Sequence, residues 1–158
     1  MSVKLADVQT AIAALSISGI QRIYTSTSAA KESFMRDLPV LMPDPSRPME
    51  GGRSDRKTVG RIPGQAMWVR TRTLNYVCLV AEVGAGRKPG DYAVAASDAL
   101  EAVENAFCDF ATSGIHYVGP VVIGDVGVMQ DAVSAGVNPQ QARQFIGFTV
   151  QVTVTMSY

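Results

Sequence analysis

The chain contains a single histidine, His116, which is the only candidate for a neutral-pH general base in a serine or cysteine triad. It lies between Ile115 and Tyr117 at the expected start of a strand, and no G-x-S-x-G nucleophile motif precedes it. This setting favours a partly buried strand histidine that makes one hydrogen bond. We therefore name no catalytic residues and do not expect an enzyme.

The two cysteines do not form a metal-binding motif. Cys78 and Cys108 are thirty residues apart, lack C-x-x-C spacing, and have only one histidine available to complete a zinc site. Both lie beside apolar residues and are expected to be free core thiols. Asp98, Glu101 and Glu104 could supply oxygen ligands at i, i+3 spacing, but any solvated helix face shows this spacing. We expect neither a metal nor another cofactor.

A glycine-rich segment, Gly84 to Gly90, joins an expected strand to an expected helix, where backbone N–H groups can bind a phosphate. Its third glycine comes one residue too late for the dinucleotide fingerprint G-x-G-x-x-G, and the phosphate-loop motif is absent. Arg87 and Lys88 could still hold an anion. A small nucleotide-binding or anion-binding domain therefore stays open as an alternative, and it predicts parallel strands around this segment.

A nucleic-acid module is a second alternative, because Arg70 and Arg72 alternate with Trp68 and Leu74 on one face of an expected strand. Base stacking on an aromatic side chain contributes roughly 1–3 kcal/mol, but one tryptophan beside two arginines is a small platform. The net charge is zero and only 18% of the residues are charged, so bulk positive potential would not attract nucleic acid or an anionic membrane.

The apolar patterns predict the elements that carry these residues. The 158 residues, 47% of them hydrophobic, suffice for one domain with its own core, and no apolar run approaches the roughly 18 residues of a membrane span. With no signal-peptide pattern at the N-terminus, we expect a soluble, cytosolic chain.

Helices are expected at 3–17 and 91–112, strands at 20–25, 38–42, 67–83, 117–123 and 145–156, and a single helical turn at 138–141.

Between Pro43 and Gln65, prolines and glycines are interleaved with basic residues. Such a segment neither extends a helix nor buries a face, and it greatly exceeds the usual connection of about 4–6 residues. We expect a long loop or arm that projects from the domain.

Charge is segregated along the chain. Residues 47–90 carry nine basic and three acidic groups, a net +6, whereas residues 91–142 carry seven acidic and no basic groups, a net −7. Oppositely charged patches suit a head-to-tail contact between copies that closes into a ring. Alternatively, the basic segment folds over its own helix, or the charges only keep the monomer soluble. The expected interface residues are Arg53, Arg56, Lys57 and Arg61 on the long loop, and Asp98, Glu101 and Glu104 on the helix.

The order of elements resembles that of the tail-terminator (tail-completion) proteins of long-tailed bacteriophages. The resemblance covers nearly the whole chain. It is carried by the helix at 3–18, the strand at 20–25, L-P-V-L-M-P at 38–43 before the long loop, the β stretch at 67–83, the helix at 91–112 and Q-F-I-G-F-T-V-Q-V at 144–152.

This resemblance implies an α/β fold of the α+β type, with a central, mostly antiparallel sheet flanked by an N-terminal helix and a longer second helix. It implies a homohexameric ring that caps the tail tube, stops tube polymerisation and offers a head–tail joining surface. The implied partners are further copies of the chain, the tail-tube protein and a head–tail connector or stopper protein, with DNA only passing through the lumen. The implied place is the virion tail or neck, after assembly in the host cytoplasm. Another neck component, a connector or stopper ring, is the alternative.

Overall fold

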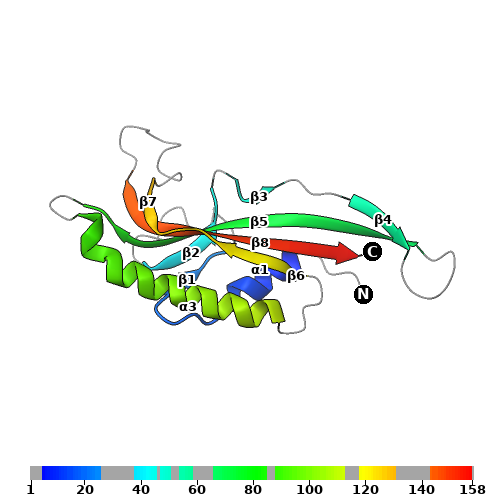
Figure 1. Ribbon diagram of the computed structural model, residues 1–158, viewed down its shortest axis with the longest axis horizontal. Coiled ribbons are helices and arrows are strands. Elements are labelled where there is room, and N and C mark those ends of the chain that lie inside the picture. The colour runs from blue at the N-terminus through cyan, green and yellow to red at the C-terminus, as the bar shows by residue number, and fades with distance from the viewer. Residues whose placement is uncertain are drawn as a thin grey trace.

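A computed structural model describes residues 5–25, 38–45, 47–50, 54–58, 66–84, 88–112, 118–130 and 143–157. In chain order its elements are α1 (Leu5–Ala13), β1 (Arg22–Ile23), β2 (Val40–Pro43), β3 (Met49–Glu50), β4 (Ser54–Thr58), β5 (Ala66–Glu82), the 3₁₀ turn η2 (Pro89–Tyr92), α3 (Ala93–Thr112), β6 (Val118–Ile123), β7 (Gly127–Gln130) and β8 (Gln144–Ser157). The two helices lie on one side of a long twisted sheet (Figure 1). The predicted α+β class, with an N-terminal helix and a longer second helix, is confirmed.

Two long antiparallel strands, β5 and β8, form the centre of the sheet. Their pairing runs from Val69 opposite Ser157 to Glu82 opposite Phe145, with one register shift between Leu79 and Ala81. The strand order is β1-β2-β5-β8-β6, β3 and β4 pair with β5, and β7 pairs with β8. Among the strand pairs of the described residues, only β1–β2 is parallel. Each central strand is therefore bordered on its outer edge by a succession of short strands.

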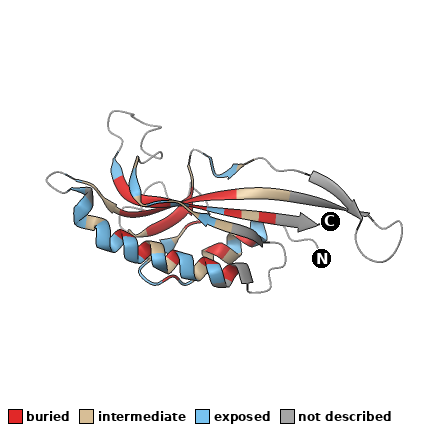
Figure 2. Ribbon diagram, in the orientation of Figure 1, coloured by how far each residue is buried: buried red, intermediate tan, exposed pale blue. Residues whose placement is uncertain are grey.

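Alternation along the central strands separates a buried face from a polar one. Phe148, Val150 and Val152 are buried beneath the helices, whereas Thr149 and Gln151 between them are exposed, as the sequence pattern predicts. On α3, the buried stripe consists of Ala96, Ala99, Val103, Phe107 and Phe110. Figure 2 shows this buried side of α3 turned toward the sheet. The helical spacing of Leu100, Val103, Phe107 and Phe110 in the sequence predicts one apolar stripe. The structure confirms it at Val103, Phe107 and Phe110, whereas Leu100 is only half-buried.

A second, smaller buried cluster lies on the opposite face of the sheet. Val77 and Leu79 of β5 pack there with Val40 and Met42 of β2, while Leu41 between them belongs to the main core. Both faces of β2 are therefore buried. Pro39, which cannot donate a backbone hydrogen bond, immediately precedes β2, and β2 is an inner strand between β1 and β5.

The other element boundaries shift slightly from the predictions. The strand expected at 20–25 contracts to Arg22–Ile23, and the β stretch at 67–83 is one continuous strand. The second helix begins at Ala93, after η2, because the Asp91 carboxylate accepts the backbone N–H of Lys88 (2.9 Å) and caps that turn. The helix expected at 3–17 ends earlier, at Ala13, and Gly19 adopts the left-handed conformation (φ 80°) in a separate turn in which the backbone N–H of Ile20 donates to the carbonyl of Ile17 (3.1 Å). The helical turn expected at 138–141 lies outside the described residues.

The segment expected as an irregular loop at 43–65 contains further strand structure. Pro43 ends β2, and β3 and β4 pair with Leu74–Thr73 and Arg70–Ala66 of β5. The prediction that this segment buries no face is wrong at Pro43, which is buried. The added strand structure has a non-local cause: the outer edge of β5 has N–H and C=O groups that require partners, and residues 49–50 and 54–58 supply them despite their weak strand propensity.

The sheet is much longer than the helical layer that covers it. The 17 residues of β5 extend roughly 56 Å, whereas the 20 residues of α3 extend about 30 Å. Figure 1 shows β4 and the adjoining ends of β5 and β8 reaching beyond the helices. We call this part, formed by β4, residues 66–71 of β5 and the paired residues 155–157 of β8, the arm.

Candidate interaction surfaces

The acidic side of α3 is exposed to solvent. Asp98, Glu101 and Glu104 are all exposed and lie on the turns whose other side carries Ala99 and Val103 in the core. Within the described part of the chain, none of these three carboxylates forms an ion pair. The solvated helix face expected from the sequence is therefore present, and its carboxylates have no basic partner among the described residues.

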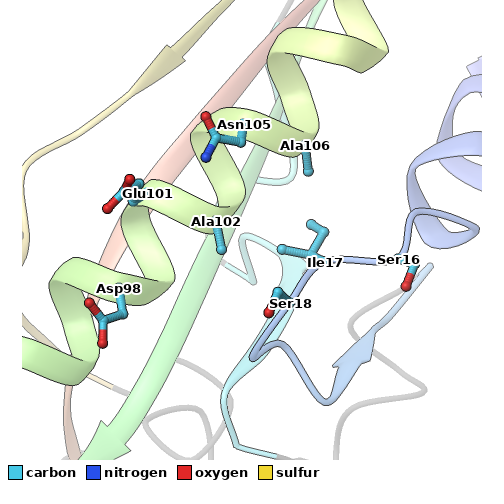
Figure 3. Close-up of a pocket in the computed structure, with 8 residues that line it drawn as sticks. All are labelled: Ser16, Ile17, Ser18, Asp98, Glu101, Ala102, Asn105 and Ala106. Atoms are coloured by element: carbon cyan, nitrogen blue, oxygen red, sulfur yellow. The ribbon is translucent and has the colours of Figure 1, made fainter.

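An open groove of about 430 Å³ separates α3 from the segment that follows α1 (Figure 3). It is lined by Asp98, Glu101, Ala102, Asn105 and Ala106 of α3, and by Ser16, Ile17 and Ser18 on the other side. In Figure 3, Ala102 and Ala106 face Ile17, and their small side chains leave the space open. We call this feature the acidic groove. Its wall carries two carboxylates, one amide and two serines, a set suited to a cationic donor.

Only two of the three predicted acidic residues belong to this groove. Glu104 does not line it, because at 100° per residue its position lies about 160° around the helix from Ala102. Ser16, Ile17 and Ser18 also line the groove and were not predicted from the sequence. The one local signal for them is Gly19, where the chain turns after Ser18 and brings this segment back beside α3.

The predicted basic residues fall partly within the described arm. Arg56 and Lys57 lie on β4, opposite Trp68 and Met67 of β5, whereas Arg53 and Arg61 lie outside the described residues. Since directly paired residues share a face of the sheet, positions 56 and 68 share one face and position 57 belongs to the other. The predicted basic group is therefore divided between two faces.

The arm lies apart from the acidic helix of the same molecule. Figure 1 shows β4 at one end of the sheet, beyond the end of the helical layer. The pairing of β4 with residues 66–70 of β5 holds it there. In this arrangement Arg56 and Lys57 do not fold over α3 of their own chain, which was one of the interpretations left open by the sequence.

The base of the arm is anchored through Asn75, which is 6% exposed. Its Nδ2 donates to the carbonyl of Arg47 (3.0 Å), its backbone N–H donates to Pro48 (3.0 Å), and its carbonyl accepts from Asp44 (2.9 Å). A pocket of about 350 Å³ lies at this point, bordered by the exposed Arg47–Glu50 ion pair of 3.3 Å. These bonds hold the 44–48 turn against β5 and so fix where β3 begins.

The two cysteines differ in exposure. Cys78 is buried on β5, as predicted, but Cys108 is exposed on α3, so the prediction of two core thiols is wrong for Cys108. Successive residues on a helix are rotated by about 100°, and this rotation places position 108 outside the core side on which Phe107 lies. Neither forms a disulfide. Burial raises the pKa of the Cys78 thiol to about 12.

This difference predicts selective labelling at pH 8. We expect maleimide or a chromogenic disulfide to modify one thiol per native chain, at Cys108, because the raised pKa keeps Cys78 protonated and its burial blocks access. Mass spectrometry of native and urea-unfolded protein should give one and two adducts. A Cys108→Ser variant is the control and should stay unlabelled until unfolded; rapid native labelling of that variant would contradict the burial of Cys78.

The remaining chemical candidates find little support in the described geometry. All strands paired with β5 run antiparallel to it, so the parallel order required by the nucleotide-binding alternative is not found around Gly84, and residues 85–87 lie outside the described part. His116 also lies outside the described residues.

Among the described residues, no three His, Cys, Asp or Glu side chains are placed to hold a metal ion. Those residues include no helix with the length and apolarity of a membrane span.

Comparison of the chain with protein-family models, with curated proteins and with solved structures found no match.

Proposed function

We propose that this chain is a structural virion protein whose copies form a ring that caps the phage tail tube, ends tube polymerisation and provides the head–tail joining surface. The observation that carries the proposal is the separation of the basic arm from the acidic groove within one molecule. Among the described residues, Asp98, Glu101 and Glu104 have no basic partner and β4 lies beyond the helical layer, so these two parts of the chain are available to meet between copies.

The type of contact follows from this separation. Because the arm and the groove are different patches, joining one to the other gives a head-to-tail contact, and repetition of such a contact closes into a ring or continues as a filament. When the ring closes, every copy makes the same two contacts, and no arm or groove is left without a partner. A ring of fixed size suits a component that ends the growth of a tube.

Charge pairs alone would hold such a ring weakly. Exposed ion pairs contribute about 0.2–1 kcal/mol each, so they select orientation while apolar contact supplies most of the affinity. Large apolar side chains do remain exposed on the described surface, namely Met49 (44%), Val94 (76%), Val122 (56%) and Val128 (49%). In a monomer these would stay in water, and a ring interface could cover them.

The assignment to the tail cap depends on the resemblance in element order. A short helix and strand lead into the 38–43 strand, the projecting arm, the long strand, the long helix and the closing strand. A connector or stopper ring of the neck is the second candidate, and it would share the self-contact but differ in its partners. The proposal includes no cofactor and no membrane, and DNA would only pass through the lumen.

Two measurements test the proposal. Size-exclusion chromatography with light scattering should give a discrete oligomer, a hexamer by the resemblance, and electron microscopy of mixtures with tail-tube protein should show tubes that stop growing once capped. Tube protein alone is the control and should give tubes of unregulated length. A strictly monomeric chain that leaves tube length unchanged at high concentration would refute the proposal. Rings that bind connector protein but not tube ends would favour the neck assignment.

A further inference from the structure

We infer that the pocket beside Asn75 binds a guanidinium group, presented by a small arginine-like molecule or by an arginine side chain of another protein. No residue that lines this pocket also lines the acidic groove. The inference therefore does not depend on the proposed function, and it would hold for a monomer.

The pocket opens on the face of the sheet opposite the main core. Val150 of β8 is buried in the main core, so its neighbours Thr149 and Gln151 belong to the opposite face, where both are exposed. Asn75 of β5 is paired directly with Gln151 and shares that face. The turn after β2 and the end of β3 close the other side of this cavity of about 350 Å³, with the polar side chains of Asp44, Arg47 and Glu50.

The Asn75 side chain brings an unused hydrogen-bond acceptor to this pocket. Its Nδ2 donates to the carbonyl of Arg47 (3.0 Å), whereas its Oδ1 has no hydrogen-bond partner within the described part of the chain, although Asn75 is only 6% exposed. The bond to Arg47 fixes the orientation of the amide, because the flipped amide would place its oxygen against another carbonyl oxygen. Buried acceptors in folded proteins nearly always have a donor, so this oxygen requires an N–H or O–H group from a ligand.

The charges around Asn75 favour a cationic donor. Asp44 and Glu50 supply two carboxylates against the one guanidinium of Arg47, so the lining has an excess of negative charge. Arg47 is bonded to Glu50 at 3.3 Å and its side chain is 70% exposed, which places it at the rim. The carboxylate of the half-buried Asp44 accepts the backbone N–H of Arg47 (3.4 Å), and each carboxylate has further lone pairs for a ligand.

A guanidinium fits this lining better than an ammonium group or a metal ion. The pocket offers oxygens of three kinds, the carboxylate of Asp44, the amide of Asn75 and the hydroxyl of Thr149. A planar guanidinium has five N–H donors in a fork and can bind several of these oxygens at once, whereas an ammonium has three donors and is more strongly hydrated. Calcium prefers about six to eight oxygen ligands, and here one of the two carboxylates is already paired with Arg47.

NMR titration of the isotope-labelled chain tests the site. The probes are methylguanidinium chloride and, as a cation of equal charge, methylammonium chloride, at constant ionic strength and below concentrations that change the circular dichroism. We expect methylguanidinium to shift the side-chain amide signals of Asn75 and Gln151 saturably, and methylammonium to bind at least about threefold more weakly. The absence of a saturable shift, shifts confined to other residues, equal binding of the two cations or tighter binding of calcium chloride would each overturn the inference.

Variants of the two acids identify the pocket as the cause. Glu50→Gln and Asp44→Asn each remove one charge but keep an oxygen acceptor for Arg47, so the turn should stay folded. Each variant should weaken methylguanidinium binding about two- to fivefold, the effect of losing one partly exposed ion pair. The control, Glu104→Gln, removes the same charge from an exposed position on α3 and should leave the affinity unchanged. Equal weakening by the control would show general charge attraction and overturn the site.

Two capped tripeptides, with arginine or lysine between two glycines, distinguish the source of the group. Tighter binding of the arginine peptide than of methylguanidinium would identify an arginine of a polypeptide, and equal or weaker binding would identify a free small molecule. A lysine peptide that binds as tightly as the arginine peptide would overturn the preference for guanidinium. A chain that forms no ring can still give these shifts, so failure of the proposed function and failure of this site are distinguishable.

Discussion

Replacing Phe107 with alanine is expected to lower the free energy of unfolding by about 3–5 kcal/mol. The Phe107 side chain is 1% exposed and lies in the core between α3 and the central strands. Its ring packs against that of Phe110 in a T-shaped arrangement, with centroids 5.9 Å apart and an interplanar angle of 74°. Truncation would remove both the buried apolar area and this aromatic contact, and leave a cavity that rigid neighbours cannot fill.

Urea denaturation followed by circular dichroism measures this loss, and Val94→Ala on the same helix is the matched control. Val94 is 76% exposed, so its truncation should change the free energy of unfolding by no more than about 0.5 kcal/mol. Similar losses for the two variants would mean that α3 does not use the Phe107 side to cover the sheet. Since the acidic groove lies on the same helix, the Phe107 variant should also assemble poorly.

Replacing Gly147 with alanine is expected to destabilise the protein by about 3 kcal/mol, at the upper end of the usual cost of overpacking. Gly147 lies on β8 opposite Leu79, and an added methyl group would collide with the carbonyl oxygen of Cys78 and also approach the Sδ of Met129 at 3.3 Å. The obstructing atom belongs to the backbone of the neighbouring strand. It cannot move without separating β5 from β8 beside their register shift.

Thermal unfolding of Gly147→Ala should be compared with that of Gly127→Ala. Gly127 is paired directly with Gly147 but lies on β7, where an added Cβ meets nothing within 4 Å. That control should be neutral or stabilising by up to about 1 kcal/mol, because alanine reduces the freedom of the unfolded chain. Equal destabilisation of both variants would show that the close approach of β8 to Cys78 is not the cause.

The buried faces of the regular elements could be predicted from local patterns. Phe148, Val150 and Val152 alternate with polar residues along β8, and Val103, Phe107 and Phe110 recur at helical spacing on α3. These periods follow from the geometry of the strand and the helix, which is why they need no knowledge of the partner. The exposed acids of α3 followed from the same period.

The two errors in burial have different causes. Cys108 follows a buried phenylalanine in sequence but lies outside the apolar stripe on the helix, which helical geometry alone explains. Pro43 is buried because β2 is an inner strand with a cluster on each face, and the strands that pack around it are distant in sequence.

The sequence by itself determined the α+β class, the absence of a recognisable catalytic motif and the segregation of charge between residues 47–90 and 91–142. Only the tertiary structure decided that residues 54–58 form a strand along β5, that Ser16 to Ser18 wall the acidic groove, and that Glu104 lies outside it. Charge and periodicity are properties of each segment, whereas strand pairing and grooves are made by two segments that meet. Pairing with the outer edge of β5 turns the polar, weakly β-forming residues 54–58 into strand β4, because the backbone groups of both segments gain hydrogen-bond partners there.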